Sequence, residues 1–525
     1  MRVRMPGSRR IRSGILAIFC LLIPVVTSGQ TPLPPGVEQV LAAPEYKHTL
    51  WGLLVVDVAT GTTVYELNPD KLFTPASVTK LFSVAAALDG LGADYRFTTP
   101  VVQRGEIDAA GELRGDLVLL ASGDLSMGGR TLPDGTIAFT NNDHTYANGG
   151  DKGELTAPDP LAGLNELARQ IAAAGVKRVH GDVLVDDRLF DKETSTGSGP
   201  ARVNPILIND NLIDLTITPG ELGKPAKITV RPATSLIRVD CRLETAAEGT
   251  PLATTIRATA PYDLIVGGKI AVGNKPVVRV YEVPNAASFA RSLFIEALER
   301  AGVTLEASPL VEQGEGALTL PREAYAKLPP VAQLSSPPFS ESAKLVLKVS
   351  HNLHASTLPM LLASTKNKRT LADGLALQHD FLARVGVDVE TISFGGGAGG
   401  SQADCVTPRA TVQLLQGMRN HPAAQAYRGA LPILGVDGTL SETVPVDSPA
   451  RGKVFAKTGT YYWDNTLNKR YLLTSKALAG YMTTAKNREL AFAVFLNRAH
   501  IAKSSDTALA GKALGKICEA IYLEQ

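Results

Sequence analysis

A chain of 525 residues is too long for one hydrophobic core, so two or three compact units are expected. Hydrophobic residues make up 44% and charged residues 20%, which is typical of a folded globular protein and excludes a largely disordered one. The 53 Lys and Arg residues nearly balance the 51 Asp and Glu residues, so a nucleic-acid-binding function has no electrostatic support.

The first 29 residues have the pattern of a signal peptide. Five arginines precede an apolar run over residues 15–26, and small residues follow it. Pro24 interrupts this run, which is short for a membrane span, although an uncleaved anchor is the alternative. Cys20 lacks the small residue that precedes a lipidated cysteine, which argues against a lipoprotein. We therefore expect an exported protein, periplasmic or otherwise extracytoplasmic, with no stable membrane span after cleavage.

Cysteine and histidine patterns give no metal motif. The mature chain keeps Cys241, Cys405 and Cys518, which allow at most one disulfide and are too widely spaced for a metal site. His351 and His354 form the closest histidine pair and could share a helix face as ligands. With no acidic or third ligand nearby in the sequence, a packing or supporting role is favoured.

The mature chain opens with a strand pair and a helix. Residues 50–58 and 62–67 read as a β-hairpin around a turn, and the small and apolar run 78–91 reads as a helix that starts near Ser77. The middle of the chain, about 97–284, is rich in short strands and polar turns. The expected strands there are 116–120, 183–185, 212–217, 227–230 and 254–258, with one amphipathic helix at 162–174.

Helices return after the β-rich middle, and strands close the chain. The expected helices are 288–301, 342–365, 371–385, 407–418 and 506–523, and the expected strands are 453–458, 477–484 and 489–497. Strands and helices at both ends, with β-rich material between them, indicate one α/β domain that a long insertion splits.

The sharpest local motif is Ser77-Val78-Thr79-Lys80 at the start of the expected helix. Residues three apart share a helix face, so Lys80 is expected beside the Ser77 hydroxyl. The helix N-terminus supplies partial positive charge and free backbone N–H groups where an oxyanion would form. Because this spacing occurs by chance in many chains, its place at a helix start is what gives it weight.

Two further motifs lie far downstream. Ser350-His351-Asn352 supplies a hydroxyl and an amide, and Lys457-Thr458-Gly459, followed by Thr460, lies on an expected strand. Each is weak alone, and the alternative for the second is a strand end that enters a turn. Together and in this order, the three motifs match the S-x-x-K, S-x-N and K-T-G pattern of serine β-lactamases and penicillin-binding proteins.

More narrowly, the chain resembles the class C low-molecular-mass penicillin-binding proteins, the DacB-like D-Ala-D-Ala carboxypeptidases and endopeptidases. Ser77 and Ser350 lie 273 residues apart, and members of this family likewise insert two extra domains there. The likeness covers nearly the whole mature chain, and its further stretches are 115–119, 122–124, 203–211, 431–440 and 478–481.

The resemblance implies an α/β (α+β) fold of the serine β-lactamase/transpeptidase type, with an antiparallel sheet flanked by helices and a long β-rich insertion that forms one or two extra domains. We expect residues 37–98 and 285–525 to form the catalytic domain. The expected insertion has one β-rich domain, residues 99–125 with 200–284, and a second domain, residues 126–199.

A serine hydroxyl is a poor nucleophile at neutral pH and needs a base within hydrogen-bond reach. Lys80 can serve only when neutral, and at its ordinary pKa roughly one molecule in 2,500 is neutral at pH 7. Burial and a neighbouring cation could lower that pKa by about 3 units, and Lys457 is the expected cation. The base is disputed among related enzymes, so this assignment to Lys80 is a hypothesis.

The resemblance also implies roles for the remaining motif residues. Ser350 would relay a proton to the leaving amine, and Asn352 would hold the substrate amide. Backbone N–H groups of Ser77 and Thr460 would form the oxyanion hole. The Lys457-Thr458-Gly459 strand would bind the free carboxylate of the terminal D-alanine.

Three departures from the family pattern bear on substrate range more than on acyl-enzyme chemistry. His351 stands where the family usually has Asp or Asn. The glycine-rich stretch 396–401 keeps Ser401 but lacks two polar groups of the family. Residues 461–475 make a longer link after the Lys–Thr–Gly strand than is usual.

The expected function is that of a serine D-alanyl-D-alanine carboxypeptidase, with endopeptidase activity left open, that acts on peptidoglycan stem peptides through an acyl-enzyme on Ser77. Peptidoglycan peptides and β-lactams are the expected partners, and neither a metal nor an organic cofactor is expected. A β-lactamase or D-aminopeptidase is the alternative within the superfamily. A catalytically weak wall-binding or penicillin-sensing module is the alternative from another class.

Overall fold

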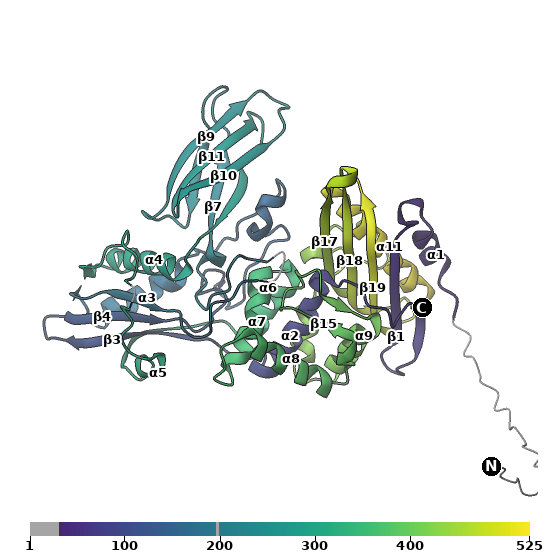
Figure 1. The fold of residues 1–525 in the computed structure, drawn as a ribbon, viewed down its shortest axis with the longest axis horizontal. Helices are drawn as coiled ribbons and strands as arrows, with labels where there is room; N and C mark the ends of the chain where they lie inside the picture. Colours follow the sequence, from purple (N-terminus) through teal and green to yellow (C-terminus); the bar gives the residue numbers. More distant parts are fainter. Residues whose placement is uncertain (1–30, 196–198, 315) are drawn as a thin grey trace, which may run out of the picture.

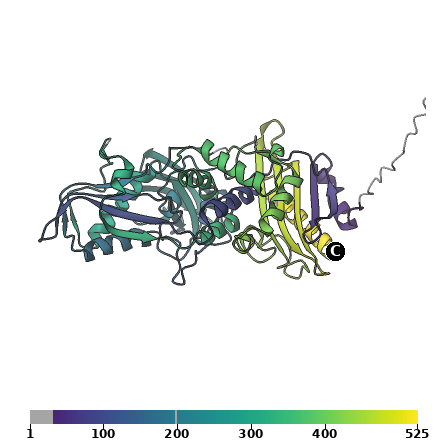
Figure 2. The same ribbon diagram turned by 90° about the horizontal axis from the view of Figure 1, so that it is seen from below.

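The computed structural model describes residues 31–195, 199–314 and 316–525. The expected signal peptide, residues 1–29, lies outside the described residues. Within the described part of the chain, no helix combines the length and the apolar character that a membrane span needs. The molecule is elongated, with the C-terminal strands and their helices at one end and the β-rich middle of the chain at the other (Figures 1 and 2).

A five-stranded antiparallel sheet joins the two ends of the chain. Its strand order is β17-β18-β19-β1-β2, so β1 pairs with β19 although more than 400 residues separate them. The strand bounds are Leu50–Asp57 (β1), Thr63–Leu67 (β2), Val454–Asn465 (β17), Arg470–Thr483 (β18) and Glu489–Ile501 (β19). The expected antiparallel sheet is therefore present, with strands longer at the C-terminal end than the sequence predicted.

Helices cover both faces of this sheet. Because alternate residues of a strand point to opposite faces, strands that are apolar throughout can bury both faces. On one face, Ala491, Ala493 and Phe495 of β19 pack into a core with six helices. These are Thr79–Leu91 (α2), Phe339–Val349 (α6), Asn352–Ser364 (α7), Leu371–Arg384 (α8), Pro408–Arg419 (α9) and Ala424–Gly429 (α10). On the other face, Phe492 and Val494 pack against the terminal helices, Pro35–Leu41 (α1) and Thr507–Glu524 (α11).

The inserted part begins with a mixed sheet that two helices cover. Its strand order is β13-β5-β4-β3-β14, and β6 also pairs with β4. The strand bounds are Thr98–Ile107 (β3), Glu112–Leu120 (β4), Arg178–Val179 (β5), Val183–Asp186 (β6), Thr304–Leu305 (β13) and Pro330–Ser335 (β14). Ala162–Ala173 (α3) and Ala286–Arg300 (α4) bury their apolar faces in the same core as these strands, and the short helix Arg322–Tyr325 (α5) lies beside β3 and β4 (Figure 1).

Two three-stranded sheets project from this layer (Figure 1). One has the order β12-β7-β8, and the other has the order β10-β11-β9. The bounds are Leu212–Thr218 (β7), Lys227–Arg231 (β8), Arg238–Ala246 (β9), Ala253–Ala260 (β10), Asp263–Ala271 (β11) and Val277–Glu282 (β12). A further two-stranded ladder, Ile392–Ser393 (β15) with Cys405–Val406 (β16), lies near the catalytic helices.

The pairing of strands differs from the expected division of the insertion. β5 and β6 pair with β4, so strands from residues 126–199 join the sheet of residues 99–125. β14 pairs with β3, and α4 packs into the inserted core. No local pattern predicts the pairing of β3 with β14, because more than two hundred residues separate these strands in the chain. We propose that the catalytic unit combines the residues before 98 with those after 335.

A break between two helices is the second difference. The apolar pattern predicted one helix over 342–365, but α6 ends at Val349 and α7 begins at Asn352. Ser350 caps α6 in the left-handed conformation, with φ 67°. The S-x-N motif therefore lies in a sharp turn between two helices, and Ser350 and Asn352 line one cleft.

Candidate active site

Ser77 lies where a 3-10 turn, Ala76–Val78 (η2), leads into α2. Ala76 adopts a left-handed φ of 47°, which turns the chain sharply just before the serine. Lys80, one turn later, is fully buried, and its Nζ donates to Ser77 Oγ at 2.7 Å. The expected Ser–Lys contact on one helix face is therefore present in the structure.

The Lys80 ammonium has two further partners. Its Nζ donates to Asn352 Oδ1 and to the carbonyl oxygen of Ala398, both at 2.8 Å. Burial lowers the pKa of Lys80 to about 7, although the Asp404 carboxylate raises it. Burial, rather than the expected Lys457 cation, is thus the main cause of the lowered pKa.

Ser350 and Lys457 meet on the opposite side of the cleft. Lys457 Nζ donates to Ser350 Oγ at 2.8 Å and to the carbonyl oxygen of Thr458 at 2.7 Å. Lys457 is fully buried, and its pKa is well below the ordinary value because of burial and the positive charges of Lys80 and Lys476. Two buried lysines therefore connect the three motifs. Lys80 bonds to Ser77 and Asn352, and Lys457 bonds to Ser350.

The strand β17 passes directly beside the nucleophile. A Cβ on Gly459 would lie 2.3 Å from the carbonyl oxygen of Pro75, so only glycine allows this approach. Thr458 Oγ1 donates to Thr439 Oγ1 at 2.8 Å, and Thr460 is exposed and accepts a hydrogen bond from Lys476 Nζ at 2.9 Å. All four residues of the third motif region thus lie at the cleft or against the Ser77 turn.

The motif side chains open into one cavity of about 840 Å³. Ser77, Ser350, Asn352, Thr458 and Thr460 line it. Residues 141–143 and 149–153 of the inserted part line its other side, together with Tyr146. The insertion therefore supplies one wall of the candidate active site.

Several residues of the site were not found from the sequence. Tyr146, in the 3-10 turn His144–Gly149 (η3), donates to the carbonyl oxygen of Ser350 at 2.5 Å. Lys476 reaches the cleft from β18, and burial lowers its pKa to about 8. Thr439 lies in the stretch 431–440 that resembles the family, which was the one available signal. The others depend on strand pairing and loop position, which no local motif encodes.

The glycine-rich stretch supports the Ser77 turn. Gly399 has φ 79°, and a Cβ there would lie 1.9 Å from the carbonyl oxygen of Ala76. The Asp404 carboxylate fixes the stretch by accepting from the backbone N–H groups of Gly395 at 2.7 Å and Ser401 at 3.0 Å. The stretch therefore allows close backbone packing and presents the Ala398 carbonyl to Lys80.

The profile of the D-Ala-D-Ala carboxypeptidase 3 (S13) family matches residues 34–514. The chain belongs to this family. A D-alanyl-D-alanine carboxypeptidase of Actinomadura sp. (strain R39) is 28% identical over 489 residues, which cover 89% of this chain and 81% of that protein.

Two solved structures share the fold of this chain. The crystal structure of penicillin-binding protein 4 (dacB) from Haemophilus influenzae has a TM-score of 0.69 and 20% identity, over 93% of this chain and 98% of that one. The structure of the same H. influenzae protein with a β-lactam has a TM-score of 0.65 and 20% identity, over 93% and 99%. The expected family and fold class are confirmed, and the alternatives of a β-lactamase, a D-aminopeptidase or a binding module are not favoured.

Proposed function

We propose that this member of the D-Ala-D-Ala carboxypeptidase family hydrolyses the terminal D-alanyl-D-alanine bond of peptidoglycan stem peptides through an acyl-enzyme on Ser77. The observation that carries the proposal is the 2.7 Å contact between Ser77 Oγ and the buried Lys80 Nζ. A β-lactam carries a reactive acyl group and a carboxylate like the peptide does, so it would acylate the same hydroxyl.

Lys80 activates the nucleophile in this proposal. With a pKa of about 7, about half of the molecules carry a neutral Lys80 at pH 7, far more than an ordinary lysine allows. The neutral amine takes the hydroxyl proton as Ser77 Oγ attacks the carbonyl carbon. Backbone N–H groups of Ser77 and Thr460 stabilise the resulting oxyanion, supported by the close approach of Gly459 to Pro75.

The leaving amine receives a proton from Ser350. Ser350 Oγ lies 2.8 Å from Lys457 Nζ, so the buried lysine can return a proton to the serine. Asn352 holds the substrate amide, and its orientation is set by the bond from Lys80 Nζ to its Oδ1. Water then attacks the acyl ester and loses a proton through Ser350 to Lys457, while Lys80 returns its proton to Ser77 Oγ, so the acid is released and both lysines recover their starting states.

The free carboxylate of the terminal D-alanine lies in this proposal beside the third motif. The Thr458 hydroxyl faces the cavity and offers a direct contact, while the Lys457 amine lies behind it, and an anionic carboxylate at this place favours the protonated form of that amine. A charge-assisted hydrogen bond of this kind contributes about 1.5–3 kcal/mol. Lys476, which also lines the cavity, adds a second positive charge near Thr460.

Labelling with a fluorescent penicillin, followed by an assay of D-alanine release, tests the assignment of Ser77. Ser77→Ala should abolish labelling and lower turnover by several orders of magnitude. Ser83→Ala is the matched control, because Ser83 lies on the same helix but donates to the Gly397 carbonyl away from the cavity. Labelling that persists in Ser77→Ala would overturn the proposal.

We also propose that the enzyme works outside the cytoplasm, in the periplasm or another extracytoplasmic space. Its expected substrate is assembled there, and residues 1–29 have the signal-peptide pattern. Cell fractionation tests this: the full chain should be recovered outside the cytoplasm, and a chain that begins at residue 31 should be retained inside.

A further inference from the structure

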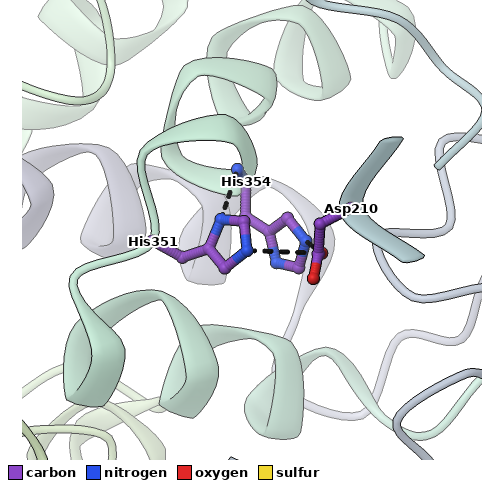
Figure 3. Close-up of side chains that lie close together, drawn as sticks. All are labelled: Asp210, His351 and His354. Atoms are coloured by element: carbon purple, nitrogen blue, oxygen red, sulfur yellow. Dashed lines mark hydrogen bonds and ion pairs between the residues drawn. The ribbon is translucent and has the colours of Figure 1, made fainter. Parts of the chain in front are cut away.

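Three buried side chains gather behind the S-x-N motif. His351 and His354 come from the start of α7, and Asp210 comes from the 3-10 turn Asn209–Asn211 (η4) of the inserted part (Figure 3). Asp210 Oδ1 lies 2.7 Å from His354 Nε2 and 3.2 Å from His351 Nε2. The acidic group that the sequence did not place near the histidines is thus supplied from the inserted part.

The histidine nitrogens are incompletely satisfied. His351 Nε2 is buried and has no hydrogen bond of acceptable direction, although it points at Asp210 Oδ1 (Figure 3). His354 Nδ1 is buried and also lacks a hydrogen-bond partner. Unpaired ring nitrogens are rare in buried positions, and an ion bound at His351 Nε2 would account for the first of these two.

The second carboxylate oxygen of Asp210, Oδ2, is held by residues other than His351 and His354. Asp210 Oδ2 accepts from Arg130 Nη2 at 2.6 Å and lies 3.0 Å from His144 Nε2. His144 Nδ1 lies 2.6 Å from Asp214 Oδ1, so both of its nitrogens face carboxylates. With both ring nitrogens already engaged by carboxylates, His144 holds Asp210 in place and has no nitrogen left for an ion. This arrangement fixes Asp210 and directs Oδ1 at the two remaining histidines.

We propose that Asp210 Oδ1, His351 Nε2 and His354 Nε2 bind one divalent transition-metal ion of the Zn²⁺ class. Two imidazoles and a carboxylate are a common ligand set for zinc, whereas Ca²⁺ and Mg²⁺ prefer oxygen ligands alone. Ligands about 2.0–2.2 Å from a tetrahedral zinc lie about 3.3–3.6 Å from one another, so the observed 3.2 Å fits, and the 2.7 Å contact must lengthen by about 0.6 Å when the ion binds. Hydrogen bonds to the outer side of a ligating carboxylate are typical of such sites.

Coordination requires a limited rearrangement. The two imidazole rings stack with centroids 3.7 Å apart and planes 20° apart, so they must turn away from each other to direct both Nε2 atoms at one ion. His351 Nδ1 must also release the His354 backbone N–H, which it accepts at 3.3 Å. A cavity of ≈ 360 Å³ borders Asp210 and His351, which gives room for this movement and for a water as fourth ligand.

The ion would tie the inserted part to the catalytic unit. Asp210 belongs to the insertion, and His351 lies between Ser350 and Asn352 of the S-x-N motif. An ion at this point would hold the turn that carries both residues without touching the substrate. The three ligands are therefore positioning residues, and their effect on the reaction is indirect.

Metal content of the full-length protein tests the proposal. After incubation with excess Zn²⁺ and desalting, the wild type should retain about one equivalent, and Zn²⁺ should raise its melting temperature. Added Co²⁺ should give the visible absorption bands of a tetrahedral site. His351→Asn keeps a good helix cap and introduces a residue usual in the family, and it should retain under a tenth of an equivalent. His379→Ala, which changes an exposed histidine, should bind like the wild type.

Two results would overturn the site. The first is a wild type that retains under a tenth of an equivalent of Zn²⁺, with no shift in melting temperature and no Co²⁺ spectrum. These three measurements use the wild type alone, so they do not depend on how a variant folds. The other is equal retention by His351→Asn and wild type. In either case the trio would be a hydrogen-bonded contact between the two parts. Circular dichroism and penicillin labelling verify that the variant is folded.

Discussion

Burial of Lys80 links the geometry of a single residue to the pH dependence of the reaction. The acylating form needs Lys80 neutral, and burial holds its pKa at about 7. Protonation below this value removes the base, so the rate of penicillin acylation should rise about tenfold per pH unit from pH 5 to 6.5 and level off above about pH 8. Stopped-flow measurement of the second-order acylation rate between pH 5 and 9 checks this. A midpoint near the ordinary lysine pKa would contradict it.

Lys457 has two candidate roles, capture of the substrate carboxylate and lowering of the Lys80 pKa. Burial is the main cause of the lowered Lys80 pKa, so we favour capture. An acyl-D-Ala-D-Ala peptide should then be cleaved about ten- to a hundredfold faster than its C-terminal amide, and Lys457→Ala should erase most of that preference. Measuring kcat/KM for the peptide and its amide, with the wild type and with Lys457→Ala across pH, decides between the two roles. Equal losses on both peptides with a raised pH optimum would favour the other role.

At the scale of elements, close packing of the glycine-rich stretch against the Ser77 turn should matter for acylation. Gly399→Ala places a Cβ 1.9 Å from the Ala76 carbonyl oxygen, so the turn that carries the nucleophile must shift. Gly386→Ala is the matched control, because its φ of 87° is also left-handed but a Cβ there meets open space. Both should lose about 1–2 kcal/mol of stability from backbone strain. Only Gly399→Ala should also lower the penicillin acylation rate, by tenfold or more.

Denaturant unfolding and acylation kinetics on both variants separate the two effects. Equal acylation by the two glycine variants, at equal loss of stability, would show that the approach of Gly399 to Ala76 is unimportant for the nucleophile.

The sequence located what local spacing can encode. Ser77 and Lys80 share one helix turn, and their contact followed from helix geometry alone. The break at Ser350 was missed because the apolar pattern continues through it and no glycine or proline marks it. Tyr146 and Asp210 were missed because long-range packing brings them to the motif, and no spacing rule predicts that.

At the scale of the whole molecule, the insertion leaves and re-enters the catalytic unit at one point. Thr98 of β3 and Ser335 of β14 are paired residues on adjacent strands, so the two chain ends lie side by side. The Phe97 backbone N–H also donates to Ser336 Oγ at 2.9 Å. A short linker can therefore replace residues 98–335 without stretching the catalytic unit.

Two shortened chains test where the insertion ends. A chain that lacks residues 98–335, joined by a short Gly/Ser linker, should still melt cooperatively, because it removes the inserted core as a whole. It should melt at a lower temperature than the full chain, because it also removes four residues that pack among the catalytic helices, Leu125, Phe190, Val203 and Leu207. A chain that lacks only residues 99–284 should aggregate or melt without a sharp transition. It keeps α4, whose Phe289, Leu293 and Phe294 are fully buried against the deleted strands. Soluble yield and thermal unfolding by circular dichroism compare the two.

The shorter of the two chains should also lose activity for a reason separate from folding. Removal of the insertion takes away Tyr146, which holds the Ser350 carbonyl at 2.5 Å, and one wall of the cavity. Penicillin labelling of Ser77 should therefore persist but slow, because Ser77 and Lys80 remain while the S-x-N turn loses support. Tyr146→Phe in the full chain isolates this contact, since it removes one hydroxyl and keeps the fold.

If the chain that lacks 99–284 proved the more stable of the two, residues 285–335 would belong with the catalytic unit after all.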